Sequence, residues 1–127
     1  MLSTKNMARS NTAQGNRYRK KTKDWYKDHG YITEYCEHVQ GIFTPRGIIY
    51  KKSDLFGADG IAMNGKEIIF WNSKSTIQAK KGVTDMIKKG KDEFAKFPFP
   101  PTVKRVIVMW EPRKPPVFVD CTYPLAE

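Results

Sequence analysis

The sequence predicts a single domain of the α/β class, in which helices pack against one β-sheet. Aromatic and apolar residues recur at helical spacing in residues 16–29 and again in residues 83–96. Between and after these segments lie short runs rich in β-branched and aromatic residues, which is the composition of strands. The length of 127 residues fits one domain with a single hydrophobic core. The elements follow in the order helix, three or four strands, helix, two strands.

The N-terminal part changes character at residue 16. Residues 1–15 contain almost no side chains to bury, which predicts a flexible basic N-terminal arm ahead of a single folded domain, residues 16–127. A helix is expected to start at Asn16, whose side chain can cap it. It is expected to end at Gly30, because a left-handed residue commonly follows the last helical turn. The residues expected to face the sheet are Tyr18, Thr22, Trp25 and Tyr26.

Six short segments have the composition of β-strands. A turn at residues 41–47 separates the first two, and a bend at residues 54–57 leads into the third. Asn64-Gly65 is a strong hairpin signal, so the third and fourth strands are expected to be neighbours. The fourth is rich in β-branched and aromatic residues, which favours a central position in the sheet. The six segments are residues 31–40, 48–51, 60–63, 67–74, 103–110 and 117–121.

A second helix is expected between the fourth and fifth of these strands. Its apolar residues form one stripe, and it should end near Lys96. Its first residue is not fixed by the sequence, because Gly82 interrupts the helical pattern. A stiff proline-rich connector, residues 97–101, follows it. The stripe consists of Val83, Met86, Ile87, Gly90 and Phe94.

The formal net charge of +10 is the strongest signal in the composition. Basic residues concentrate in residues 1–30 and in a second cluster at residues 80–91. Clustered positive charge on a small domain is typical of nucleic-acid binding. The alternatives are a merely soluble basic protein or a ribosome-associated protein. The residues expected to contact nucleic acid are Arg17, Arg19, Lys20, Lys21, Lys23, Lys80, Lys81 and Lys88.

Several classes of protein are not expected from this sequence. No apolar run approaches the ~20 residues that a membrane span needs, so no membrane partner is expected. The first 16 residues lack the apolar region of a secretory signal. Cys36 and Cys121 are too few for a disulfide framework and lack the spacing of a zinc site. We therefore expect a cytoplasmic protein whose two cysteines are reduced thiols in the core.

A carboxylate, an amide and an ammonium group are expected to meet at one edge of the sheet. Asp59 comes from the strand before the Asn64-Gly65 turn, and Asn72 and Lys74 come from the strand after it. Side chains two residues apart on a strand point to the same face. Because Mg²⁺ and Mn²⁺ prefer oxygen ligands, Asp59 and Asn72 are candidate metal ligands. Lys74 could orient a water molecule or stabilise charge on a phosphoryl group.

Two further carboxylates are candidates for the same site. Glu37 lies on an earlier strand among aromatic neighbours and could be a second metal ligand. Asp54 precedes the glycine bend and could support catalysis. Each has an alternative role, because Asp54 can cap the turn and Glu37 can be a solvated strand residue. Glu34, on the opposite face of the strand, is a weaker candidate for the role of Glu37.

These residues resemble the motif of the PD-(D/E)XK nuclease superfamily, whose members include Holliday junction resolvases and VRR-NUC-type enzymes. The family pattern places an acidic residue after a proline, then a variable turn, then an acid or glutamine, any residue, and lysine. Here the corresponding residues are Ala58-Asp59 and Asn72-Ser73-Lys74, so alanine replaces the proline and asparagine replaces the final acid. The segment 54–59 is similar to that of small phage and bacterial resolvase-like nucleases, and Glu37 falls where those proteins have a glutamate.

The resemblance implies a restriction-endonuclease-like fold, with a central mixed β-sheet of about five strands flanked by helices. It also implies Mg²⁺- or Mn²⁺-dependent cleavage of DNA, including branched or Holliday junction DNA, and often a homodimer in a bacterial or phage-infected cell. Asp59, Asn72 and Lys74 would form the catalytic centre, supported by Glu37 and Asp54. Because Asn72 removes a negative charge and the first helix lacks a glutamate, the alternative is a catalytically degenerate nucleic-acid-binding protein on the same scaffold.

Overall fold

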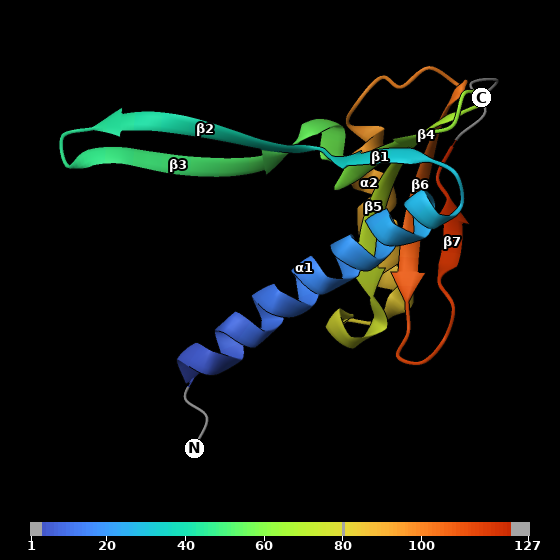
Figure 1. Cartoon of the computed structure of the whole chain (residues 1–127). Helices are drawn as coiled ribbons and strands as arrows, with labels where there is room; N and C mark the ends of the chain where they lie inside the picture. The colour runs from blue at the N-terminus through green and yellow to red at the C-terminus, as the bar shows by residue number, and fades with distance from the viewer. Residues whose placement is uncertain (1–3, 80, 123–127) are drawn as a thin grey trace.

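The chain forms a five-stranded β-sheet with one helix on each face, and a separate two-stranded ribbon that projects from this body (Figure 1). The computed structural model describes the backbone of residues 4–79 and 81–122, and the side chains of residues 15–37, 39–51, 55–79 and 81–122. Its elements are α1 (Thr4–Asp28), β1 (Ile32–Tyr35), β2 (Glu37–Thr44), β3 (Gly47–Asp54), β4 (Gly60–Met63), β5 (Ile68–Ser75), α2 (Val83–Ala95), β6 (Val103–Trp110) and β7 (Val117–Asp120). Two short 3₁₀ turns, Leu55–Gly57 and Thr76–Gln78, flank the central strands.

The sheet has the strand order β1-β4-β5-β6-β7. The pair β5–β6 is parallel, and the other three pairs are antiparallel. The parallel pair needs a crossover connection, which α2 supplies. This is the mixed sheet flanked by helices that the sequence predicts, and β5 has the central position expected from its composition.

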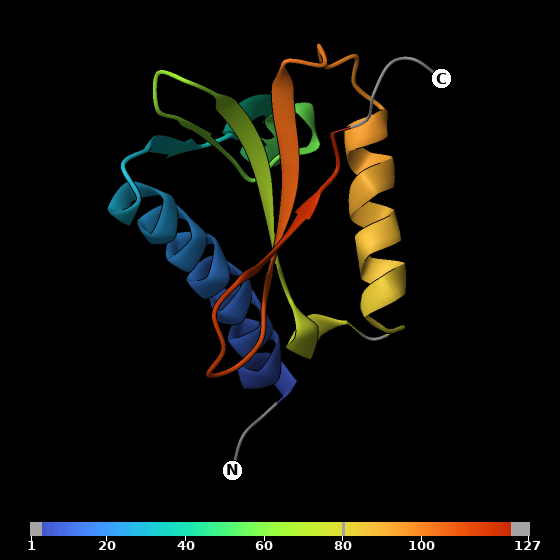
Figure 2. The ribbon, with the colours of Figure 1, turned by 90° about the vertical axis from the view of Figure 1, so that its right-hand side faces the viewer.

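The two faces of the sheet are covered by different helices (Figure 2). Tyr18 and Tyr26 of α1 pack against one face, together with Trp71 of β5. On the other face Phe94 of α2 packs against Ile107 of β6. Because neighbouring residues of β6 point to opposite faces, its buried run from Val106 to Trp110 serves both cores.

Helix α1 starts earlier than the sequence analysis placed it. The helix begins at Thr4 rather than at Asn16, so most of the predicted arm continues the helix. Residues 4–14 contain no proline and include good helix formers such as alanine, lysine and methionine, which allows the extension. The predicted end is confirmed, since Gly30 has φ +87° and Tyr31 N–H donates to Tyr26 O at 2.9 Å.

The predicted strand 31–40 is in fact divided between two sheets. β1 ends at Tyr35, and after Cys36 the chain leaves the body to pair with β3 alone. The predicted turn 41–47 is correspondingly shorter, because β2 continues to Thr44 and β3 starts at Gly47. Alternation of apolar residues continues through the break, so the pattern carries no signal for the change of sheet.

Most of the remaining predicted elements are confirmed, with boundaries equal to the predicted ones or shifted by one residue, but β3 continues three residues beyond the predicted strand 48–51, to Asp54. The bounds of β4 and β6 are those predicted, and β5, α2 and β7 are each found at the expected place. Asn64 and Gly65 lie in the turn between β4 and β5, where Asn64 Oδ1 accepts the N–H groups of Lys66 and Glu67 at 3.0 Å. Cys36 and Cys121 are buried and unbridged, as expected. No helix in the described part of the chain is long and apolar enough to cross a lipid bilayer.

Candidate active site

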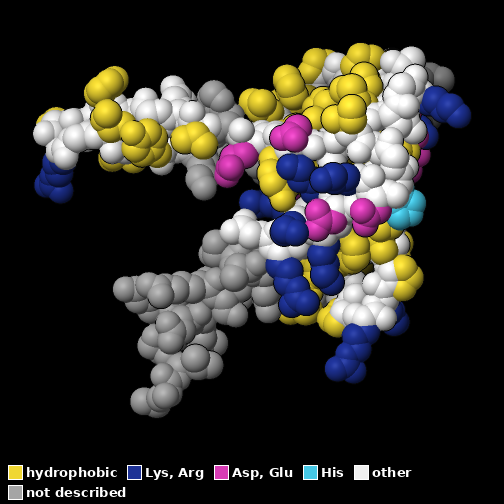
Figure 3. All heavy atoms as spheres, in the orientation of Figure 1, with side chains coloured by type: hydrophobic (Ala, Val, Ile, Leu, Met, Phe, Trp, Pro, Cys, Tyr) yellow, Lys and Arg dark blue, Asp and Glu magenta, His cyan; other side chains and the backbone are white. Residues whose placement is uncertain are grey.

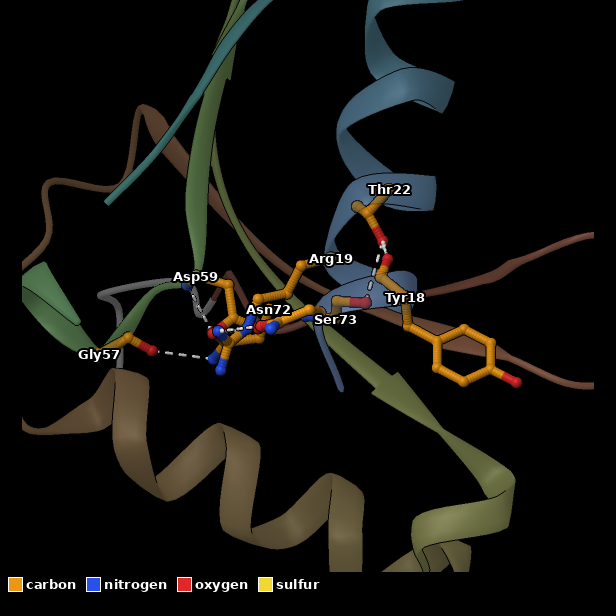
Figure 4. A network of polar contacts seen from close by, with 8 residues as sticks. Tyr18, Arg19, Thr22, Gly57, Asp59, Asn72 and Ser73 are labelled. Atoms are coloured by element: carbon orange, nitrogen blue, oxygen red, sulfur yellow. Dashed lines mark hydrogen bonds and ion pairs between the residues drawn. The ribbon is translucent and has the colours of Figure 1, made fainter. Parts of the chain in front are cut away.

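Asp59 lies one residue before β4, and the backbone of neighbouring segments holds it in place (Figure 4). Its N–H donates to Trp71 O at 3.0 Å, and its carbonyl accepts the N–H of Cys36 at 2.9 Å. Its carboxylate, which is only 9% exposed, accepts the backbone N–H of Ser73 through Oδ2 at 2.8 Å. The carboxylate is therefore fixed beside β5 and is not a mobile surface group.

Asn72 holds the backbone around Asp59. Its Oδ1 accepts the Asp59 N–H at 2.8 Å, and its Nδ2 donates to Gly57 O at 2.9 Å. The side chain is buried, so both polar ends of the amide need these partners. Asn72 is predicted to be a metal ligand, and its oxygen accepts one backbone hydrogen bond. An amide oxygen has two lone pairs, so one is left for the predicted metal contact. The two hydrogen bonds of the side chain also hold the backbone on either side of Ala58, and so help to position Asp59.

Asp59, Asn72 and Lys74 line one pocket of about 550 Å³ between β5 and α2, which we call the polar pocket. Asn72 and Lys74 lie on the side of β5 that faces α2, as their two-residue spacing predicts, and Phe70 of the same strand packs in the core on that side. The other wall comes from α2 and the residues after it. The remaining lining residues are Gly57, Lys89, Glu93, Lys96 and Phe97.

Glu93 is a second carboxylate in the polar pocket, and the sequence analysis missed it. Gly57 explains why α2 comes so close: a Cβ on this residue would meet Glu93 O at 3.1 Å, and its φ of +70° also favours glycine. One signal was available, because Lys89, Glu93 and Lys96 have the spacing i, i+4, i+7 of one helix face. The sequence pattern alone does not show that this face of α2 lies opposite Asp59, because that depends on how the helix packs.

Helix α1 supplies a cation on the other side of Asp59. The Nε atom of Arg19, which is partly buried, lies 3.7 Å from Asp59 Oδ1. One turn later, Thr22 Oγ1 is completely buried, lies 3.0 Å from Ser73 Oγ and accepts the indole N–H of Trp110 at 2.8 Å. This network fixes the position of α1 against β5, and therefore the position of Arg19 near the carboxylate (Figure 4).

Glu37 does not line the polar pocket. It is the first residue of β2, its side chain is exposed, and in register it lies opposite Asp54. The expectation that Glu37 joins Asp59 therefore fails for a physical reason, which is that the chain leaves the sheet after Cys36. The side chain of Asp54 lies outside the described residues. Glu34, the weaker candidate, forms an ion pair with Lys23 at 3.7 Å and also lies away from the pocket.

The basic residues predicted to contact nucleic acid fall into two groups. On α1, Arg17, Lys20 and Lys21 are exposed, and the hydrogen bond from Lys20 to Asp24 raises the pKa of the Lys20 ammonium group. Lysine and arginine side chains gather where α1 crosses the sheet (Figure 3). On the α2 side, Lys88 is exposed and Lys80 lies outside the described residues.

A second hollow of about 300 Å³ adjoins the polar pocket, and we call it the lysine pocket. It shares Lys74 and Lys89 with the polar pocket and extends to Lys81 near the start of α2. Asp85 is the one carboxylate among its lining residues and forms an ion pair with Lys89 at 3.5 Å. The described residues that line the two hollows along α2 include four lysines and three carboxylates, and the lysines are suited to contact a chain of phosphates.

No family model matches the chain, and no curated protein matches it either. Solved structures that are similar to it include the following two. One is Hjc, a Holliday junction resolvase from the archaeal hyperthermophile Archaeoglobus fulgidus, with 13% identity, a TM-score of 0.47, and coverage of 84% of this chain and 77% of that one. The other is SSO0001, with 17% identity, a TM-score of 0.51 and coverage of 91% of this chain. The chain spans only 53% of the length of SSO0001, and at such identity the likeness concerns the fold alone.

Proposed function

We propose that this chain is a metal-dependent nuclease that hydrolyses phosphodiester bonds of DNA, including branched DNA. The observation that carries the proposal is the polar pocket, in which the fixed carboxylate of Asp59 and the ammonium group of Lys74 lie beside two lysines of the α2 segment. Branched DNA as the substrate rests on the resemblance of residues 54–59 and 72–74 to the motif of resolvase-like nucleases.

Asp59 and Glu93 would hold a magnesium or manganese ion in the polar pocket. Among the described side chains, no three of the types His, Cys, Asp or Glu cluster as a metal cage. Mg²⁺ keeps several waters and commonly binds through one or two carboxylates together with phosphate oxygens, so this pair fits the ion. When bound, such an ion would lower the pKa of a water molecule and neutralise charge on the phosphoryl group.

The residues of the chain itself would place the scissile phosphate and stabilise its charge. Lys74 lines the pocket beside Asp59 and would face the negative charge that develops on the phosphoryl oxygens. Lys89 and Lys81 would hold the neighbouring phosphates along the lysine pocket. Because each phosphate contact releases counterions, log K for duplex DNA should fall with log[salt] with a slope of about −0.9 per contact.

Cleavage of labelled linear and four-way-junction DNA with Mg²⁺ or Mn²⁺ tests this proposal. Asp59→Asn keeps an oxygen that can accept the Ser73 N–H but removes the charge, and Lys74→Met removes the ammonium group at similar length. Each is expected to lower the rate by about 10²- to 10³-fold, the usual effect of losing one electrostatic contact to the transition state. Lys114→Met is the matched control, because Lys114 is exposed in the β6–β7 connection. Unchanged cleavage by either pocket variant, or cleavage in EDTA, would contradict the proposal.

A second candidate function is DNA binding without cleavage. Two contacts favour it: Arg19 already lies 3.7 Å from Asp59, and the oxygen of Asn72 is used by the backbone. In this case the pocket would hold a phosphate between cations and would need no metal. Titration calorimetry separates the two functions, because a binder takes up DNA without taking up Mn²⁺, whereas the nuclease takes up both.

The homodimer implied by the family resemblance is proposed to form through the β2–β3 ribbon. A two-stranded ribbon is marginally stable in water on its own. Hydrophobic side chains lie along this one (Figure 3), and Ile42 and Ile49 occupy the opposite face from Phe43, Ile48 and Tyr50. Phe43 near the tip is 85% exposed. Apolar surface of this kind commonly marks a contact with another protein chain.

A further inference from the structure

A third hollow lies next to the polar pocket, and its walls are almost entirely aromatic and apolar. This cavity of about 270 Å³, which we call the aromatic pocket, is formed by the turn before Asp59, by β5 and by the connector after α2. Its lining residues include Phe56, Phe70, Phe97, Pro98, Phe99 and Pro100. The sequence analysis treated the connector only as a stiff linker, so this pocket has no role in the function described so far.

The phenylalanine rings form one interlocked set. Phe56 meets Phe70 and Phe97 edge to face, with ring centroids 5.9 Å apart in both pairs, and Phe70 lies 5.0 Å from Phe99. Phe56 nevertheless stays 51% exposed. Burial of this residue therefore does not explain its position, since about half of its surface stays accessible.

Phe56 also has an unusual backbone. Its φ of 57° and ψ of 28° lie in the left-handed region, which a bulky side chain seldom adopts. Residues in such conformations are held by their surroundings and cluster at functional sites. Here the surroundings include the candidate active site, because the carbonyl of the next residue, Gly57, accepts a hydrogen bond from Asn72 Nδ2 at 2.9 Å. The turn that presents Phe56 is thus tied to the same amide that positions Asp59.

The three hollows are neighbours along the α2 side of the sheet, because each shares lining residues with the next. Phe97 lines both the aromatic pocket and the polar pocket. Lys74 and Lys89 line both the polar pocket and the lysine pocket. A lysine-lined region, a carboxylate and an aromatic cavity therefore follow one another. A single nucleic-acid strand offers the matching order, with phosphates on its backbone and the flat π-face of a base beside each of them.

We propose that the aromatic pocket takes an unpaired nucleobase of the strand whose phosphate lies at Asp59 and Lys74. The proposal rests on the proposed function only for the binding of nucleic acid, and not for cleavage. Every base has a π-face, and the aromatic and proline walls of the cavity have little with which to read base edges, so the pocket would accept different bases. The substrate class is then DNA with an unstacked nucleotide next to the bound phosphate, as in single strands, flaps and junctions, and not continuous duplex.

Binding to single-stranded oligonucleotides in EDTA, followed by fluorescence anisotropy, tests this without requiring cleavage. An abasic nucleotide is moved along the strand, and at one position the affinity is expected to fall by about tenfold, within the range for one base–aromatic stack. Phe56→Leu should lower the affinity for the intact strand by the same factor. The abasic nucleotide should then lower the affinity of this variant no further. Leucine keeps a Cβ at this backbone position, so the left-handed geometry is equally strained in the variant and in the wild type.

Phe97→Leu is the second variant and Phe118→Leu is the control, because Phe118 is an exposed phenylalanine of β7 that contacts Trp25 on the α1 side of the sheet, away from the three hollows. Thermal unfolding of each variant shows whether it is folded. A flat abasic scan, or equal loss of intact and abasic binding by Phe56→Leu, would overturn the proposal. So would a change of sedimentation coefficient with Phe56→Leu in the absence of DNA, because the occupant would then be a second copy of the chain. Binding with the expected scan but without cleavage in Mg²⁺ would leave this inference standing while the nuclease proposal fails.

Discussion

Replacing Asn72 with aspartate tests the hydrogen-bond arrangement on which the candidate site depends. The substitution is nearly isosteric, and the new carboxylate can still accept the Asp59 N–H. The new carboxylate cannot donate to Gly57 O. At neutral pH one of its oxygens would take the place of Asn72 Nδ2, which lies 2.9 Å from Gly57 O, so two acceptor oxygens would face each other. Loss of one buried hydrogen bond and an unsatisfied acceptor together should lower the free energy of unfolding by about 2–3 kcal/mol.

The loss should depend on pH with a definite sign. A protonated carboxyl group can donate to Gly57 O, so folding raises the pKa of the introduced group above its unfolded value of about 3.9. At 1.36 kcal/mol per pKa unit, a loss of 2–3 kcal/mol corresponds to a folded pKa near 6. The variant should therefore match the wild type at about pH 4, lose stability between about pH 4 and 6, and show the full deficit at about pH 7.

Urea unfolding of wild type and Asn72→Asp at both ends of this pH range measures the effect. Asn64→Asp is the matched control, because Asn64 is exposed and uses only its oxygen, as an acceptor for Lys66 and Glu67 N–H. It should be close to neutral at both pH values. Equal stability of wild type and Asn72→Asp at pH 7, or a deficit that does not change with pH, would show that the amide of residue 72 is not oriented as described.

Two further predictions concern the scaffold. Thr22→Val should lower the free energy of unfolding by about 1–3 kcal/mol in urea titrations, because the indole N–H of Trp110 would stay buried without its acceptor. Thr84→Val, on the exposed side of α2, is the control and should have little effect. Equal stability of the two variants would contradict the role of the buried network. Phe43→Ser should shift a homodimer to monomer in sedimentation velocity while the body stays folded in circular dichroism. A wild-type chain that sediments as a monomer at all concentrations would refute association through the ribbon.

The elements that could be predicted are those whose signals are local. The bounds of β6 follow from a segment of high apolar content between two proline-containing segments, and the β4–β5 connection follows from Asn64-Gly65. The end of α1 also follows from a local signal, which is the glycine at position 30. Its start could not be placed, because the polar residues before Asn16 have adequate helix propensity but no apolar stripe by which to recognise a helix.

The parts that could not be predicted depend on which segments meet in space. Glu37 looked like a companion of Asp59 because the alternation of residues 31–40 is uniform, and only the pairing of β2 with β3 takes it out of the sheet. Glu93 is not among the predicted site residues, and it lines the pocket because Gly57 lets α2 approach the turn before Asp59. The pocket thus contains Glu93 in place of the predicted Glu37, because the local pattern around each residue does not show which segments meet in space.

The exchange changes the electrostatics of the site. A carboxylate on the sheet would have stood beside Asp59 at a fixed distance, whereas Glu93 comes from α2, where it also lies 3.4 Å from Lys96. Three lysines line the polar pocket and Arg19 lies against Asp59, so in the described part of the chain the cations near this site outnumber its two carboxylates. Such a pocket attracts a phosphate more strongly than a free divalent cation. The phosphate oxygens of a bound strand would then complete the ligand set that Asp59 and Glu93 begin. The described side chains, which form no cage of three such ligands, are therefore compatible with metal-dependent cleavage, provided that DNA and metal occupy the pocket together.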